Sequence, residues 1–176
     1  MRQGLAALVA STAMAALSGA VVPAMAQVPA AAHKPAGAEL AVFKKAIRAQ
    51  YDLKEKAWAA QDYQRLVTGF YSPQAFTAAE GEPNFYAQGR EQFLELYKTY
   101  VADTTQIRIE SVHTYVNGNM GWDWTNFHAN VKPEKVKEYP PSPVRILFIW
   151  EKIAGKWVCS GDVVLLGTFD TTSKAR

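Results

Sequence analysis

Cysteine is almost absent from this sequence, because Cys159 is the only one among 176 residues. A single thiol cannot close an internal disulfide, so the folded chain has to rest on its apolar core alone. The three histidines share no ligand spacing and have one cysteine to assist them, so we expect no metal site. Cys159 stands between Val158 and Ser160 in an expected strand, which favours a buried, inert thiol over a nucleophile.

A strong excess of charge is also missing. The chain has 19 basic and 16 acidic side chains, which gives a net charge of +3. So small an excess argues against nucleic acid or an anionic membrane surface as a partner. The sequence also has no Gly-rich phosphate loop and no nucleophile elbow, and we expect no cofactor.

The first 26 residues have the three-part layout of a secretory signal peptide. Arg2 supplies positive charge, residues 4–22 are uncharged and mostly Ala, Leu and Val, and Ala24-Met25-Ala26 is a small-x-small cleavage motif. We predict cleavage between Ala26 and Gln27, which makes the protein periplasmic or secreted, with no stable membrane insertion afterwards. The alternative is a retained membrane anchor, since the apolar run is almost long enough to span a bilayer.

The rest of the chain is expected to form one domain of ordinary size. Residues 27–37 are rich in Ala and Pro and are predicted to be a disordered leader. Residues 38–168 are the predicted domain, and residues 169–176 are a polar, flexible tail. Material for a core is plentiful, because the chain has 5 Trp, 8 Tyr and 8 Phe, none of them in the signal peptide.

Helical periodicity predicts three helices in the first half of the domain, at 38–60, 63–70 and 90–100. Asp62 is a good N-cap for the second of them, and a short strand at 75–79 lies between the second and the third. The apolar arc of the first helix is expected to contain Leu40, Val42, Phe43, Ala46, Ile47, Ala49, Leu53, Ala57 and Trp58.

From residue 105 the apolar period changes to two, which predicts strands. Four long strands are expected, at 106–116, 120–131, 144–153 and 156–167, with hairpin turns at Asn117-Gly118 and Ala154-Gly155 and a surface loop at 132–143. A change of parity in the first strand predicts a bulge near Glu110-Ser111. Helices followed by antiparallel strands indicate the α+β class, with a strongly bent sheet.

Three motifs in this order resemble those of the nuclear-transport-factor-2-like superfamily, which includes ketosteroid isomerases and SnoaL-type cyclases. They are Ala60-Gln61-Asp62-Tyr63 between the first two helices, Gln88-Gly89-Arg90-Glu91 before the third, and Gly155-Lys156-Trp157-Val158 at the last hairpin. The resemblance implies a cone, in which the bent antiparallel sheet wraps around the long N-terminal helix and leaves a deep apolar pocket. These motifs indicate architecture and not chemistry.

Tyr51 and Lys54 are the candidate ligand-binding side chains of the long helix. Lys54 lies eight residues before Asp62, where the resemblance implies the oxyanion-hole tyrosine of ketosteroid isomerases, so the sequence departs from the isomerase pattern. A cation lining the pocket would bind a carboxylate or enolate oxygen. Alternatively, Lys54 lays its stem on the core and extends its amine to water.

Three further residues are candidate acids or bases. Glu80 follows the short strand close to where the resemblance implies a catalytic Asp, but it could equally be a solvated loop acid. Asp162 interrupts an apolar strand, so its carboxylate must be paired, at an edge or facing a polar pocket. His128 shares one strand face with Trp122 and Trp124, and a pair between His128 and Asp162 would be the most enzyme-like arrangement.

The aromatic residues Trp58, Trp122, Trp124 and Trp150 are predicted to line the pocket. The first functional hypothesis is therefore an exported domain that binds a small apolar or aromatic ligand without catalysis. The second is a cofactor-independent isomerase, dehydratase or cyclase, with Glu80, Asp162 or His128 as its base.

The third hypothesis is an interaction module that forms a homodimer through the outer face of the sheet. Two polar candidates meeting at one cavity would favour the enzyme, and a filled interior with an exposed apolar sheet would favour the module.

Overall fold

The computed structural model describes residues 37–81 and 85–171. The predicted signal peptide, its cleavage site and the leader up to residue 36 lie outside the described residues, as do the last five residues of the predicted tail. No helix among the described residues has the length and apolarity needed to cross a membrane.

Three α-helices form where the periodicity predicts them: α1 (Gly37–Ala59), α2 (Tyr63–Phe70) and α3 (Arg90–Asp103). The Asp62 carboxylate caps α2, accepting a hydrogen bond of 2.9 Å from the backbone N–H of Arg65. A short 3-10 helix, η1 (Pro133–Glu138), lies within the segment expected to be a loop.

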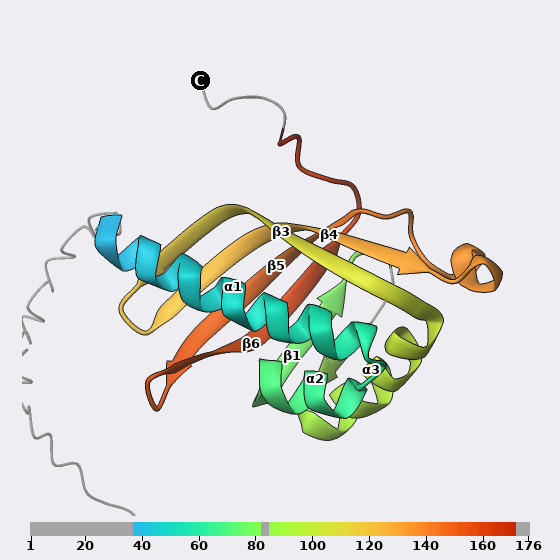
Figure 1. Cartoon of the computed structure of the whole chain (residues 1–176), viewed down its shortest axis with the longest axis horizontal. Helices are drawn as coiled ribbons and strands as arrows, with labels where there is room; N and C mark the ends of the chain where they lie inside the picture. Colours follow the sequence, from blue (N-terminus) through green and yellow to red (C-terminus); the bar gives the residue numbers. More distant parts are fainter. Residues whose placement is uncertain (1–36, 82–84, 172–176) are drawn as a thin grey trace, which may run out of the picture. The chain divides into compact units, whose positions relative to one another are not determined.

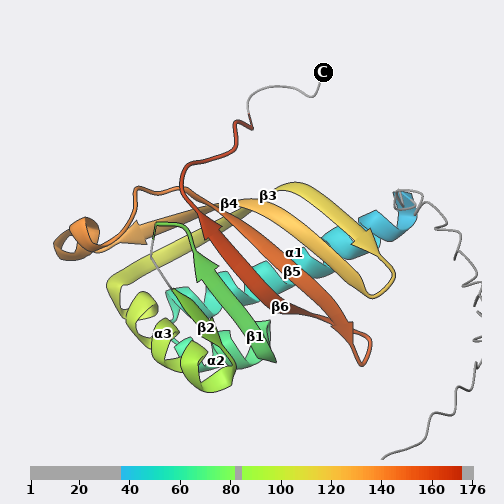
Figure 2. The ribbon, with the colours of Figure 1, turned by 180° about the vertical axis from the view of Figure 1, so that it is seen from behind.

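One six-stranded sheet contains all of the described strands, in the order β2-β1-β6-β5-β4-β3 (Figure 1; Figure 2). Their bounds are β1 (Tyr71–Ala79), β2 (Tyr86–Gln88), β3 (Thr104–Asn117), β4 (Met120–Val131), β5 (Val144–Ile153) and β6 (Lys156–Leu165). The pairing of β1 with β6 is parallel, and the other pairings are antiparallel. The predicted α+β class and the helix-wrapping bent sheet are confirmed.

The first two strands differ from the prediction. The strand β1 begins at Tyr71, four residues early, because its parallel pairing with β6 starts there and the register shifts before Phe76. The irregularity accommodates Pro73, which has no backbone N–H to donate to a ladder. The three-residue strand β2 was not predicted, since so short a segment shows no period.

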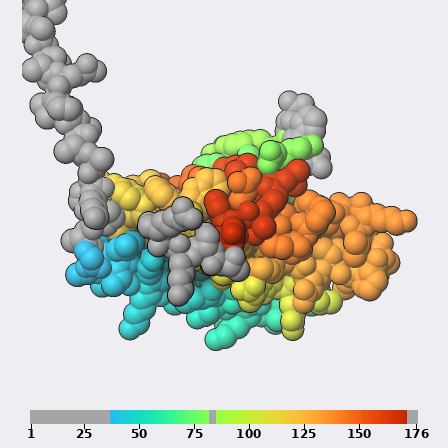
Figure 3. All heavy atoms as spheres, turned by 90° about the horizontal axis from the view of Figure 1, so that it is seen from above, coloured from blue at the N-terminus to red at the C-terminus, as the bar shows by residue number. Residues whose placement is uncertain are grey.

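The helix α1 lies against one face of the sheet (Figure 1), and in the view from above its cyan spheres fill one side of the molecule while the red spheres of the C-terminal part lie toward the other (Figure 3). Its buried residues are Phe43, Ile47, Tyr51, Lys54, Ala57 and Trp58. Val42 is 67% exposed and Ala49 is exposed, so the predicted arc was too wide on that side. The true buried face includes Tyr51 and Lys54, which hydropathy alone assigns to the edge or outside of the arc.

Close packing of α1 on the sheet depends on Gly121 of β4. A methyl group at that position would lie 2.6 Å from the Phe43 ring and 2.9 Å from the Tyr115 carbonyl oxygen. The predicted bulge in β3 is present, with a register shift between Ser111 and His113, just beyond the expected position. The bulge bends β3 along α1 and so brings the sheet around the helix.

Candidate functional site

The amine of Lys54 lies in the interior of the domain. The side chain is 1% exposed, and its Nζ donates hydrogen bonds to the Tyr71 hydroxyl at 2.6 Å and to the Tyr97 hydroxyl at 3.0 Å. Because a buried ammonium group needs such partners, the two phenols fix its position. The alternative that Lys54 extends its amine to water is therefore wrong.

Asp162 joins this group through Tyr71. The Tyr71 hydroxyl donates to Oδ2 of Asp162 at 2.5 Å, and it also makes a hydrogen bond with the Tyr97 hydroxyl. Asp162 is 2% exposed, which removes the edge and outward-facing alternatives for its carboxylate. We call Lys54, Tyr71, Tyr97 and Asp162 the polar cluster.

Four different elements supply the polar cluster. Lys54 comes from α1, Tyr71 from the first position of β1, Tyr97 from α3 and Asp162 from the inner face of β6. The parallel pairing of β1 with β6 brings Tyr71 to the carboxylate. The cluster therefore exists only in the assembled fold, and no local motif encodes it.

Aromatic rings surround the Lys54 amine. Its Nζ lies 4.5 Å from the centre of the Phe70 ring and 5.0 Å from that of Phe148, with the Phe127 ring at 5.9 Å and those of Tyr71 and Tyr97 closer. These distances are typical of cation–π contacts. The rings stabilise the ammonium form, but they also exclude the water that would otherwise solvate it.

The electrostatics of the polar cluster follow from this exclusion of water. Desolvation lowers the pKa of Lys54 from 10.5 to about 8, against the attraction of Asp162. Burial raises the pKa of both phenols, Tyr71 and Tyr97, and the negative charge of Asp162 raises them further. At neutral pH the cluster thus holds a cation that loses its proton easily beside two phenols that keep theirs.

A second buried carboxylate, Asp123, was not among the predicted site residues. It is fully buried on the inner face of β4 and accepts hydrogen bonds from Tyr51 at 2.8 Å, Ser111 at 2.6 Å and Thr114 at 2.7 Å. Burial raises its pKa, and the three hydroxyl donors oppose that shift. The signal that identified Asp162, an acid that interrupts the apolar residues of a strand, was also present here.

Tyr51, Trp58 and Trp150 lie in the interior, as predicted for pocket residues. The Trp58 indole donates to the Thr104 hydroxyl at 2.5 Å. Trp150 is fully buried against Tyr51, with ring centres 5.5 Å apart, and its indole N–H makes no hydrogen bond within the described residues. Burial and the charge of Asp123 raise the pKa of the Tyr51 phenol, and the neighbouring Trp150 opposes that shift.

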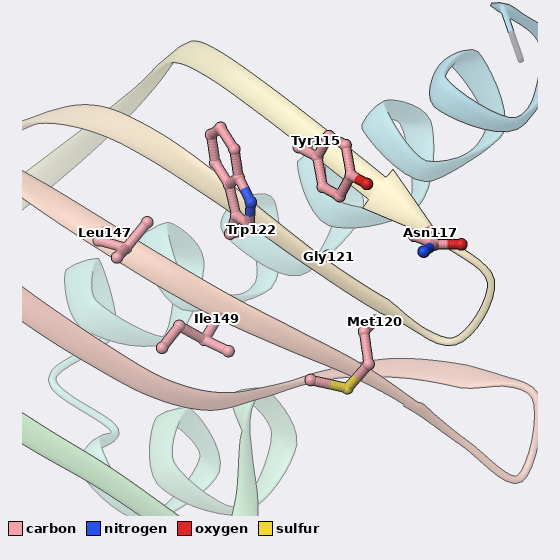
Figure 4. Close-up of a pocket in the computed structure, with 7 residues that line it drawn as sticks. All are labelled: Tyr115, Asn117, Met120, Gly121, Trp122, Leu147 and Ile149. Atoms are coloured by element: carbon pink, nitrogen blue, oxygen red, sulfur yellow. The ribbon is translucent and has the colours of Figure 1, made fainter. Parts of the chain in front are cut away.

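Trp122 and Trp124 do not line the interior, and this part of the prediction was wrong. They lie on the outer face of the sheet, because Asp123 between them occupies the inner face. Trp122 is 37% exposed and stacks on Tyr115, and Trp124 packs against Phe169 of the C-terminal segment. Trp122 borders an open hollow of about 480 Å³ on this outer face, with Tyr115, Asn117, Met120, Gly121, Leu147 and Ile149 (Figure 4).

Glu80 and His128 lie apart from the polar cluster. Glu80 is exposed, and its carboxylate accepts a hydrogen bond of 2.8 Å from the backbone N–H of Leu166. The His128 ring lies on the outer face of β4, at 2.7 Å from Arg108 and 3.4 Å from Glu110. A pair between His128 and Asp162 cannot form, because the two side chains are on opposite faces of the sheet.

The interior around the polar cluster is closed. The cluster residues are at most 6% exposed, and the Phe93 ring covers Tyr71 at 4.6 Å and Tyr97 at 6.0 Å between ring centres. The deep pocket implied by the resemblance is filled by aromatic side chains at this point. Cys159 is buried nearby, and burial raises the pKa of its thiol. No group of three metal-binding side chains occurs within residues 37–81 and 85–171.

Comparison with known proteins supplies structural matches only. No family model matches the chain, and no curated protein does. A protein of unknown function from Shewanella oneidensis, described as nuclear-transport-factor-2-like, is 15% identical, with a TM-score of 0.57 over 70% of this chain and 98% of its own.

Two further matches are named after activities. A proposed dehydratase of the same fold family from Streptomyces avermitilis is 14% identical, with a TM-score of 0.55 over 73% of this chain and 99% of its own. A proposed scytalone dehydratase from Novosphingobium aromaticivorans is 12% identical, with a TM-score of 0.56 over 77% and 91%. At these identities the matches establish architecture and not activity. The chain therefore has the nuclear-transport-factor-2-like fold that its sequence motifs indicate.

Proposed function

We propose that this protein is exported and binds a small apolar or aromatic molecule in the interior of the cone, holding one oxygen of that molecule at the polar cluster. The observation that supports this function is the meeting of Lys54 and Asp162 at the Tyr71 hydroxyl, inside a shell of aromatic rings. Aromatic walls with a few convergent polar groups are typical of small-molecule sites.

The polar cluster is not what stability alone would select. Replacing a buried charged group by an apolar side chain of similar volume is often neutral or stabilising. A methionine at position 54 would fill similar space among Phe70, Phe127 and Phe148 without the cost of desolvating an amine. A lysine held there therefore points to a role in function, and that role is to bind a ligand oxygen such as a carbonyl, phenolate or carboxylate.

Ligand entry requires side chains to move, because the cluster is closed. Phe93 of α3 covers the rings of Tyr71 and Tyr97, and Tyr97 itself belongs to α3. The N-cap of α3 is Gly89, which has a φ of 84° and provides no side-chain cap. We propose that displacement of this first part of α3 opens the interior to a ligand.

Native mass spectrometry of the protein purified from its own source tests this function. The expected result is a bound small molecule that is lost in Lys54→Met and kept in Lys56→Met, a matched change at an exposed lysine of the same helix. Mature protein beginning at Gln27 in the exported fraction would support export. A ligand that survives in Lys54→Met would refute the assignment of the site to the polar cluster.

The outer face of the sheet supports a second candidate, a homodimeric interaction module. The hollow beside Trp122 is bordered mainly by apolar side chains, and Met120 at its edge is 49% exposed. Exposed apolar patches of this kind mark interaction sites. Sedimentation velocity at several concentrations tests it, and a monomer at every concentration would refute it.

A further inference from the structure

Lys54 is the one buried lysine within residues 37–81 and 85–171, since the others there are exposed or half-buried. A buried lysine with a purely structural role is usually paired directly with a carboxylate, and Lys54 is not so paired in the part of the chain that the structure describes. Within the described residues no carboxylate contacts its Nζ directly, because the Tyr71 hydroxyl stands between the amine and Asp162. Both hydrogen-bond partners of the amine are phenol hydroxyls, and a phenol hydroxyl can donate a proton as well as accept one.

We propose that Lys54 forms an imine with the carbonyl group of a small aldehyde or ketone. This inference rests on the proposed function, and it names the substrate class of that site. Buried lysines in apolar surroundings are suited to this chemistry, because the reaction needs the neutral amine.

The step requires no co-reactant beyond the carbonyl compound. The neutral Nζ attacks the carbonyl carbon, a C–N bond forms, and one proton passes from nitrogen to the former carbonyl oxygen, which gives a carbinolamine. The C–O bond then breaks and the oxygen leaves as water. Nitrogen loses two protons in total, and both end on that water molecule.

Tyr71 is placed to move these protons. Its hydroxyl is 2.6 Å from Nζ and 2.5 Å from Oδ2 of Asp162, so it can pass a proton from nitrogen to oxygen while the carboxylate holds its orientation. The Tyr97 hydroxyl, at 3.0 Å from Nζ, holds the amine from the α3 side. The surrounding rings keep bulk water out, which disfavours hydrolysis of the imine once it forms.

The lowered pKa of Lys54 is consistent with this role. With a pKa of about 8, Lys54 has roughly 300 times more neutral amine at pH 7 than a lysine at the ordinary 10.5. The Lys54 amine should therefore react out of proportion to the exposed lysines if a carbonyl compound reaches it. Because the rings leave little room, small aldehydes are the appropriate probes.

Reductive trapping with acetaldehyde and cyanoborohydride at pH 7 tests the inference on the full chain. Peptide mapping should find Lys54 ethylated at least tenfold faster than Lys56, with Lys56→Arg leaving the labelling of Lys54 unchanged. Tyr71→Phe should slow the labelling of Lys54. Labelling of Lys56 with none at Lys54 would overturn the inference.

The pH profile of the wild-type protein gives a readout that does not depend on a variant folding. The labelling rate of Lys54 should reach half its maximum near pH 8 and level off at about pH 9, one unit above its pKa. A rate at Lys54 that is still climbing steeply above about pH 9 would overturn the inference. If native mass spectrometry finds a non-covalently bound ligand and Lys54 is not labelled, the imine is overturned and the proposed function stands. If no ligand is found and Lys54 is not labelled, the imine and the proposed function are both overturned.

Discussion

Replacing Lys54 by methionine should change how the stability of the protein depends on pH. Desolvation lowers the pKa of Lys54 to about 8 in the folded state, while in the unfolded chain it returns to about 10.5. Between these values the unfolded chain binds one more proton than the folded protein, so the free energy of unfolding rises with pH. Below pH 8 the amine is charged in both states, and its burial carries the full cost, on the order of 3 kcal/mol.

The measurement is urea denaturation of the wild type and of Lys54→Met at several pH values from 7 to 9.5. Burial raises the pKa of the Tyr71 and Tyr97 phenols and of the Cys159 thiol, but wild type and Lys54→Met share these groups, so their contributions cancel in the comparison. The wild type should gain roughly 2 kcal/mol relative to Lys54→Met between pH 8 and pH 9.5. Lys56→Met is the control and should follow the wild type. A constant difference between wild type and Lys54→Met across this range would refute the reasoning, because it would mean that the amine is solvated.

Three other perturbations test the packing and the surfaces. Asp123→Ala should destabilise the protein by about 3 kcal/mol in urea denaturation, because three hydroxyl groups lose their buried acceptor; a loss below about 1 kcal/mol would contradict its role. Gly121→Ala should cost about 1–3 kcal/mol, because a methyl group there overlaps the Phe43 ring, whereas Gly37→Ala, with open space around it, should be neutral; equal effects of the two changes would contradict the close approach of α1 to the sheet. Trp122→Ala should change stability by less than about 1 kcal/mol in urea denaturation, since its ring is on the outer face, and it should weaken the homodimer that the second proposed function requires; a large loss of stability would place that ring in the core instead.

Local sequence signals were sufficient for most of the fold. Asp62 marks the start of α2, and the change of parity in β3 located the bulge close to Ser111. Both signals depend only on neighbouring residues, so the sequence carries them directly. The strand β1 was placed too late because its first residue, Tyr71, pairs with Cys159, and that parallel partner is far away along the chain.

The candidate site was predictable only in part. Lys54 and Asp162 were correctly singled out as polar interruptions of apolar patterns, yet their meeting depends on Tyr71 and Tyr97, which look like ordinary core aromatics. Trp122 was placed on the wrong side, because a period of two separates the two faces of a strand but does not say which face is covered. Asp123 lies next to Trp122 in the sequence and on the opposite, inner face of β4. It would have shown which face is buried only if its partners Ser111 and Thr114, on either side of the bulge in β3, had been known.

The position of β6 has a consequence for how the protein folds. This strand is the last one in the chain, yet it lies between β1 and β5 rather than at an edge. A chain that has been synthesised only as far as residue 155 lacks β6, the parallel partner of β1, so pairing over this long sequence separation must come late and slowly. Asp162 arrives with β6, so the carboxylate of the polar cluster is added only when this strand pairs. The step that completes the sheet is thus also the step that completes the polar cluster.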